Sequence, residues 1–197
     1  MIYQYPKQRP ERRHGPAGYS AYESFRPWLR DEFLFRCAYC LKREVWGQVT
    51  AEFELDHFQP QSLASNRRTD YFNLIYCCRR CNLWKTDQSI DDPLQHLAEE
   101  SIWVYPDGSV AGRTLEARRL IAQLDLDSPR MREWRVMWMR IVQLAAERDR
   151  TLFLQLVGFP KELPDLESLR PPLNSRPEGV FDSCYAKRQR GDLPEAY

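Results

Sequence analysis

The chain has 197 residues, of which 43% are hydrophobic and 13% aromatic, enough to bury the core of one compact domain with a small appendage. No apolar run approaches the roughly 18–20 residues that a membrane span needs, and the N-terminus lacks the apolar stretch of a secretory signal, so we expect a cytoplasmic protein that does not enter a membrane. The formal net charge is only +1, which argues against a nucleic-acid binder that depends on overall charge alone.

The composition divides the chain into three parts. Residues 1–18 are rich in proline, arginine and glycine and predict a flexible basic arm, which includes His14. Residues 19–160 carry periodic hydrophobic patterns and predict the folded domain with a helical extension. Residues 161–197 are rich in proline and predict an irregular C-terminal tail.

The first helix is expected to begin near Ser20. Ser20 and Glu23 have the spacing of a capping box, in which each side chain accepts a hydrogen bond from a free backbone N–H group. Apolar residues then recur at helical spacing as far as Phe33. Pro27 is expected to kink this helix or to divide it.

Two strands and a helix are expected in the middle of the chain. Residues 53–57 alternate apolar and polar side chains, which predicts a half-buried strand that Pro60 closes. Residues 74–76 form a short apolar run after a polar loop and predict the second strand of a long hairpin. A helix is expected to open near Cys81.

The remaining patterns predict a second hairpin and two more helices. Residues 102–105 and 109–110 flank a Pro-Asp-Gly turn, residues 115–124 are amphipathic, and Ser128 followed by Pro129 is typical of a helix start. The tryptophans and methionines of this last helix are expected to pack in the core. The expected fold class is therefore α+β, with a metal-bound ββα unit wrapped by N- and C-terminal helices.

Four of the six cysteines form two pairs of the same spacing. The pairs are Cys37 with Cys40 and Cys78 with Cys81. Two thiolates at this spacing can bind one ion from a single turn, and two such turns complete a tetrahedral zinc site that would stabilise the fold directly. Four buried structural thiols are the alternative, which the matched spacing disfavours. Cys77 and Cys184 are expected to be ordinary small hydrophobic residues.

Side chains that suit phosphodiester chemistry lie between these pairs and just after them. They are Asp56, His57, Asn73, Asn82 and Lys85. Taken singly, each has an ordinary explanation, such as a packed histidine, a turn cap or a solvated lysine. Hydrolysis of a phosphodiester needs an activated water and a cation to offset negative charge, and together this set offers a base and hard oxygen ligands.

The string from FRCAYC through ELDHFQP to FNLIYCCRRCNLWK resembles the HNH nuclease family, also called ββα-metal nucleases, in its zinc-containing four-cysteine branch. The resemblance covers the middle part of the chain. It implies an endonuclease that hydrolyses phosphodiester bonds with the help of a divalent ion. The habits of the family also suggest a role in bacterial or phage defence.

The resemblance implies a role for each residue. His57 would be the general base that takes a proton from the attacking water, and Asn73 would orient it. Asp56 and Asn82 would hold one ion, and Lys85, one turn after Asn82, would contact a phosphate. Asn82 stands where some branches have histidine, so Mg²⁺ or Mn²⁺ is expected there and not catalytic zinc. Because neighbours on a strand face opposite sides, the strand must end or bulge for Asp56 and His57 to share a site.

Basic side chains on the loop and helix flank this constellation. They are Arg67, Arg68, Arg79, Arg80 and Lys85. They are expected to contact nucleic-acid phosphates, which positions a substrate without reading its sequence. By resemblance the default substrate is DNA, while RNA, a protein partner and a second copy of the chain stay open.

Three hypotheses follow. A nuclease active on its own predicts divalent-dependent nicking of plasmid that is lost in His57→Ala. A non-catalytic zinc-stabilised module predicts salt-sensitive nucleic-acid binding that survives Asp56→Ala, with no cleavage in any ion. A nuclease subunit that needs a partner predicts no cleavage until that partner is present.

Overall fold

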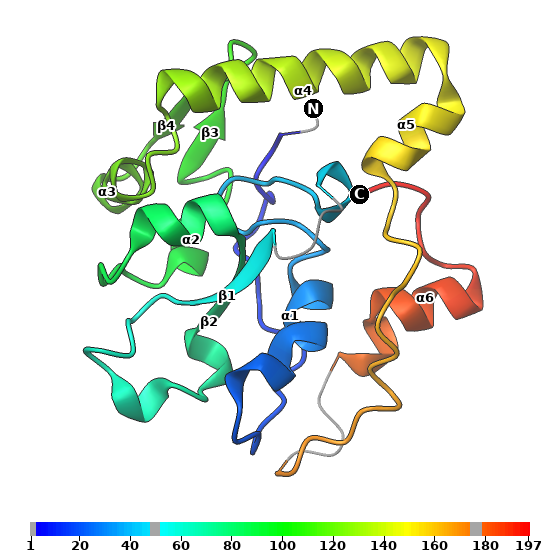
Figure 1. Cartoon of the computed structure of the whole chain (residues 1–197). Coiled ribbons are helices and arrows are strands. Elements are labelled where there is room, and N and C mark those ends of the chain that lie inside the picture. Colours follow the sequence, from blue (N-terminus) through cyan, green and yellow to red (C-terminus); the bar gives the residue numbers. More distant parts are fainter. Residues whose placement is uncertain (1–2, 48–51, 174–178) are drawn as a thin grey trace.

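The structure, a computed structural model, describes residues 3–47, 52–173 and 179–197. Within these residues the chain forms two small antiparallel sheets surrounded by helices (Figure 1). The α-helices are α1 (Arg26–Glu32), α2 (Arg79–Lys85), α3 (Leu115–Gln123), α4 (Pro129–Arg148), α5 (Arg150–Val157) and α6 (Cys184–Arg190). The strands are β1 (Phe53–His57), β2 (Leu74–Cys78), β3 (Ile102–Val104) and β4 (Val110–Gly112). Among the described helices, none combines the length and the apolar character that crossing a bilayer requires.

β1 and β2 form the hairpin that carries the central motif. They pair antiparallel in an unbroken register, from Phe53 opposite Cys78 to His57 opposite Leu74. All five residues of β2 are buried, as expected for a strand covered on both faces. α2 follows β2 directly and packs against both strands. Both strands lie where the hydrophobic pattern predicts them, and the end of β2 brings Cys78 to the start of α2.

The first helical segment begins differently from the capping-box prediction. A short 3₁₀ helix, η1 (Tyr22–Phe25), comes first, and its N-cap is Ala21, which has no side-chain oxygen to offer. Glu23 instead forms an ion pair with Arg26 at 2.9 Å. Pro27 divides the segment, because α1 begins beside it and a proline in the first turn removes only an N–H group that has no helical partner.

β3 and β4 form the predicted second hairpin. Its turn needs Gly108, which has a left-handed φ of 80° and approaches the backbone carbonyl of Arg132 too closely for a side chain. α3 then begins after Thr114, whose hydroxyl accepts a hydrogen bond from the N–H group of Ala117 at 3.1 Å. The hairpin and α3 therefore follow from turn and cap residues that are visible in the sequence.

α4 and α5 lie along one side of the molecule (Figure 1). α4 starts at Pro129, as predicted, and α5 starts after Asp149, whose carboxylate accepts a hydrogen bond from the first turn. Trp138 of α4 stacks on Trp46 with ring centroids 4.5 Å apart. This contact joins the long helix to the segment that follows the first cysteine pair.

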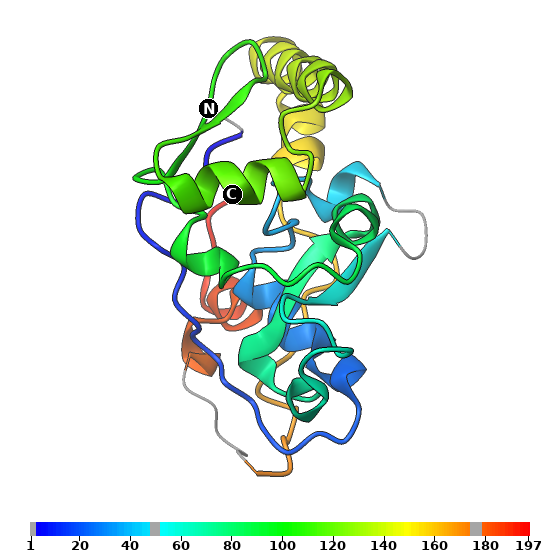
Figure 2. The same ribbon diagram turned by 90° about the vertical axis from the view of Figure 1, so that its left-hand side faces the viewer.

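Residues 3–18 pack against the domain instead of forming the flexible arm that their composition suggests. This N-terminal segment runs from the side of α4 to the side of α1 (Figure 2). Tyr5 and His14 are buried, and His14 Nε2 lies 2.9 Å from Asp31 Oδ2. Composition misses these contacts because each joins residues far apart in the sequence. The first two residues of the expected arm lie outside the described residues.

The C-terminal tail, expected to be irregular over residues 161–197, contains α6. The Ser183 hydroxyl caps the first turn of this helix, and Gly191 ends it with a left-handed φ of 80°. The N–H group of Cys184 donates to Asp31 Oδ1 at 2.7 Å, which fixes α6 against α1. Residues 174–178 of this tail lie outside the part of the chain that the structure describes.

Candidate functional site

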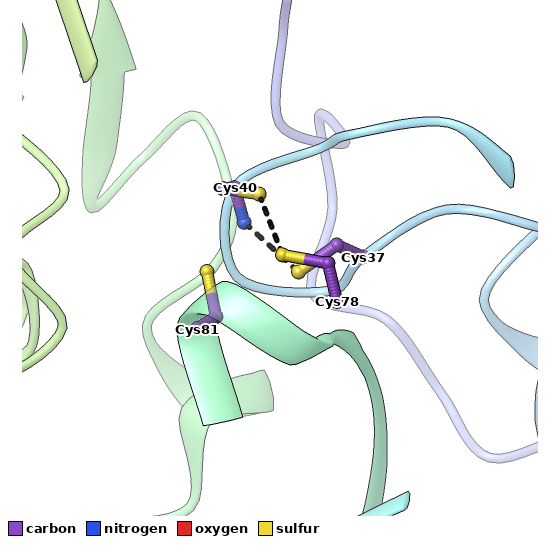
Figure 3. Close-up of side chains that lie close together, drawn as sticks. All are labelled: Cys37, Cys40, Cys78 and Cys81. Carbon is purple, nitrogen blue, oxygen red and sulfur yellow. Dashed lines mark hydrogen bonds between the residues drawn. The ribbon is translucent and has the colours of Figure 1, made fainter. Parts of the chain in front are cut away.

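The four cysteine side chains of the two predicted pairs meet at one point (Figure 3). Cys37 and Cys40 come from the loop after α1, Cys78 from the end of β2 and Cys81 from the first turn of α2. All four are buried, and their sulfurs lie within 4.8 Å of one another. The Sγ atoms of Cys40 and Cys78 are 3.6 Å apart. Zn–S bonds of about 2.3 Å give a tetrahedron with an edge of about 3.8 Å, so the donors and their spacing fit zinc.

The local backbone presents these thiols. Cys78 is the N-cap of α2, so Cys81 follows nearly one turn later. In the first pair, the N–H group of Cys40 lies 3.4 Å from the Cys37 sulfur. Hydrogen bonds from neighbouring thiols, chiefly that of Cys37, hold the pKa of Cys78 below the usual value for a thiol. Thiolate is the form that binds metal, so Cys78 favours the ligand form, whereas burial raises the pKa of the Cys37 thiol, which must lose its proton when an ion binds.

The two remaining cysteines lie outside the cluster. Burial raises the pKa of the Cys77 thiol, which lies in β2. Burial, helped by the charge of Asp31, raises the pKa of Cys184 to about 12. Both thiols therefore stay protonated near neutral pH. The prediction that Cys78 and not Cys77 joins the cluster is confirmed.

The carboxylate of Asp56 has two partners inside the protein. Its Oδ2 accepts a hydrogen bond from the Tyr39 hydroxyl at 2.6 Å, and its Oδ1 accepts one from Lys85 Nζ at 3.0 Å. The side chains of Asp56 and Lys85 are 5% and 1% exposed. Each carboxylate oxygen keeps a second lone pair, so the donor chemistry still suits a hard cation. The Lys85 ammonium, however, already balances the negative charge of the Asp56 carboxylate.

Lys85, for which the sequence predicts a contact with a phosphate, has partners inside the protein. Its ammonium group donates to Asp56 and, at 2.8 Å, to the carbonyl of His57. Cys81 lies four residues earlier and faces inward toward the other cysteines, and residues four apart share a helix face. Lys85 is therefore turned inward too and serves as the counter-ion of Asp56.

Both ring nitrogens of His57 have protein partners. Nε2 lies 2.8 Å from the carbonyl oxygen of Arg68, so the ring proton belongs on Nε2. Nδ1 then accepts from the side-chain amide of Gln61 at 3.2 Å. The ring packs edge-on against Tyr22, with centroids 4.9 Å apart. The Arg68 carbonyl therefore fixes the tautomer and leaves the lone pair on Nδ1.

Asp56 and His57 lie on opposite sides of the hairpin. β1 ends at His57, as expected, but its pairing with β2 is regular up to that residue, so no bulge turns both side chains to one side. Asp56 contacts Lys85 of α2, whereas His57 contacts Tyr22 of η1 and the loop after β1. The two side chains, which the family resemblance places at one ion, thus have separate partners.

Asn73 holds the loop that surrounds His57. Its Oδ1 accepts from the N–H group of Gln59 at 3.0 Å, and its Nδ2 donates to the carbonyls of Gln59 at 3.0 Å and Arg67 at 3.3 Å. The side chain is fully buried. Arg67 precedes Arg68, whose carbonyl accepts from His57, so Asn73 acts on the histidine through the loop backbone.

Asn82 contacts a carboxylate that sequence reasoning missed. Its Nδ2 donates to Glu54 Oε2 at 2.6 Å. Glu54 lies two residues before Asp56 and therefore on the same side of β1, a relation that strand alternation could have found. The described contacts thus pair Glu54 with Asn82 and Asp56 with Lys85, where the sequence predicts a joint site for Asp56 and Asn82.

The four predicted phosphate-binding arginines are of two kinds. Arg67 and Arg80 form ion pairs with aspartates at 2.8 and 2.5 Å, and Arg80 also donates to two backbone carbonyls. Arg68 is exposed, and the Arg79 side chain is 59% exposed and 3.9 Å from Glu54. Arg68 and Arg79 are therefore the two that can turn toward a phosphate at little cost.

A buried four-thiol cluster that joins a β-hairpin to the helix after it has the donor set of a structural zinc site. Residues 37–88 match the family model of HNH endonucleases, a segment that begins at the first cysteine and ends just after α2. This segment is therefore similar to HNH endonuclease domains, a family that indicates nuclease activity on a nucleic-acid substrate. Neither a curated protein nor a solved structure matches the chain.

Proposed function

We propose that the chain is a metal-dependent endonuclease that hydrolyses phosphodiester bonds of DNA. The observation that supports this most is the setting of His57 within the HNH segment. Its Nε2 donates to a backbone carbonyl, and its Nδ1 accepts from the exposed side chain of Gln61. A water molecule in place of the Gln61 amide would donate its proton to the same lone pair, which is the act of a general base.

In the proposed reaction, His57 removes a proton from the attacking water while Asn73 keeps the surrounding loop in place. Asp56 and Asn82, with Glu54 beside Asn82, would hold one Mg²⁺ or Mn²⁺ ion, which supplies positive charge next to the phosphate when bound. Arg68 and Arg79 would contact neighbouring phosphates. Family resemblance alone supports DNA over RNA and a role in bacterial or phage defence.

His57→Ala is expected to slow the nicking of supercoiled plasmid by about 10²–10⁴-fold, because a general base contributes that much. Wild-type activity is expected to need Mg²⁺ or Mn²⁺ and to stop in EDTA. The matched control is His96→Ala, which removes a histidine outside the HNH segment and is expected to leave cleavage unchanged. Nicking at the wild-type rate by highly purified His57→Ala protein would reject the proposal.

The opposite orientations of Asp56 and His57 favour a second candidate function. In this alternative the domain is a zinc-stabilised module that binds nucleic acid without cutting it, and Lys85 is the permanent partner of Asp56. It predicts binding that weakens steeply with salt, falls in Arg79→Ala and survives His57→Ala. It also predicts no cleavage with any divalent ion, so the plasmid assay separates the two functions.

A further inference from the structure

Tyr39 links the four-cysteine cluster to the strand that carries Asp56. It lies between the two ligands of the first pair, in the sequence Cys37-Ala38-Tyr39-Cys40. Its hydroxyl donates to Oδ2 of Asp56 at 2.6 Å. Tyr39 is 0% exposed and Asp56 4%, so water does not compete for this hydrogen bond.

The position of Tyr39 depends on the first cysteine turn, defined as residues 37–41. The N–H group of Leu41 closes this turn by donating to the carbonyl of Cys37 at 3.0 Å. Leu41 has a left-handed φ of 62°, which is unfavourable for a leucine. A metal ion bound by both thiolates of the turn would hold it in this strained form, and Tyr39 with it.

One further contact keeps the Tyr39 hydroxyl in place as a donor. Tyr5, from the N-terminal segment, donates its own hydroxyl to the backbone carbonyl of Tyr39 at 2.6 Å. The backbone of Tyr39 is therefore fixed from the side of the N-terminal segment while its hydroxyl donates to Asp56.

We propose that Tyr39 is a positioning residue that couples metal occupancy of the four-cysteine cluster to divalent-ion binding at Asp56. While the first cysteine turn is fixed, the Tyr39 hydroxyl restrains the carboxylate and orients its remaining lone pairs. When the turn is released, that restraint is lost. This inference rests on the proposed function, because it takes Asp56 to be a ligand of the catalytic ion.

Tyr39→Phe removes the hydroxyl and keeps the ring. Binding of Mn²⁺ to the zinc-loaded protein, followed by electron paramagnetic resonance, is expected to weaken about tenfold, a typical effect of losing a hydrogen-bond partner of a metal ligand. The zinc content is expected to stay unchanged. Tyr71→Phe is the matched control, because it removes an equally buried hydroxyl that donates to a different carboxylate, Glu32, at 2.6 Å, and its Mn²⁺ affinity is expected to equal that of the wild type.

Wild-type Mn²⁺ affinity in Tyr39→Phe would overturn this inference. Asp56→Asn shows whether the role of Tyr39 or the ion site itself is wrong. If Mn²⁺ binding is weakened in Asp56→Asn but normal in Tyr39→Phe, only the role of Tyr39 is rejected. If Mn²⁺ binding is normal in both variants, the ion site at Asp56 is rejected as well. If Tyr39→Phe does not fold, 3-fluorotyrosine at position 39 keeps the hydroxyl. Its ¹⁹F signal is expected to shift during a Mg²⁺ titration, and a constant signal rejects the coupling.

Discussion

Replacing Cys78 with serine is expected to abolish the cooperative thermal unfolding transition of the domain. A structural zinc ion contributes about 10–16 kcal/mol, as much as the whole free energy of unfolding of a typical domain, about 5–15 kcal/mol. The cluster joins the loop after α1, the end of β2 and the start of α2, so its loss frees three segments at once. Circular dichroism on heating measures the transition, and elemental analysis is expected to find one zinc per wild-type chain and little in the variant.

The matched control for this change is Cys77→Ala. Cys77 is the neighbouring residue, equally buried, but it lies outside the cluster. It is expected to bind zinc as the wild type does and to lose only the stability that goes with a small cavity, about 1 kcal/mol. A Cys78→Ser protein that contains no zinc and yet unfolds at the same temperature as the wild type would show that the thiols are merely packed together.

The four-cysteine cluster and the central hairpin could be predicted because their signals are local. The spacing of each cysteine pair fits one turn, and only Cys78 stands at the right distance from Cys81 to form the second pair. Strand alternation in residues 53–57 then fixes one strand of the hairpin. Each of these signals is contained in a few neighbouring residues, so folding elsewhere does not change it.

The contacts of Asp56 could be predicted only in part. Lys85 follows Cys81 of the four-cysteine cluster by four residues, so helix periodicity could have shown that it faces inward. Its pairing with Asp56 and the hydrogen bond from Tyr39 join residues 29 and 17 positions apart, and no local pattern reports such contacts. The sequence therefore does not reveal which of these side chains pair.

The terminal segments were mispredicted for a related reason. Residues 3–18 are polar and rich in proline, which is also the composition of disordered chain. Their order comes from single buried anchors, such as the Tyr5 hydroxyl on the Tyr39 carbonyl and His14 on Asp31. Average composition cannot detect a few anchors of this kind, although it describes the rest of the segment well.

Lys85→Met is expected to lower the free energy of unfolding by about 3–5 kcal/mol, because it leaves the Asp56 carboxylate buried without its counter-ion. Methionine keeps a long unbranched side chain, so little packing is lost. Urea denaturation measures the effect. Lys42→Met is the matched control, since Lys42 pairs with Glu52 while both side chains are partly exposed, at 21% and 34%, and such pairs contribute no more than about 1 kcal/mol.

The double variant Asp56→Asn with Lys85→Met identifies the source of that cost. Asparagine has nearly the shape of aspartate and its carbonyl oxygen can still accept from the Tyr39 hydroxyl, but it carries no charge that needs a partner. Because replacing both members of a buried ion pair is often neutral, the double variant is expected to regain most of the stability lost in Lys85→Met. If the double variant is as unstable as Lys85→Met, the lysine stabilises the domain through its packing and not through its charge. If Lys85→Met and Lys42→Met lose the same stability, the ion pair of Lys85 with Asp56 is not buried in solution.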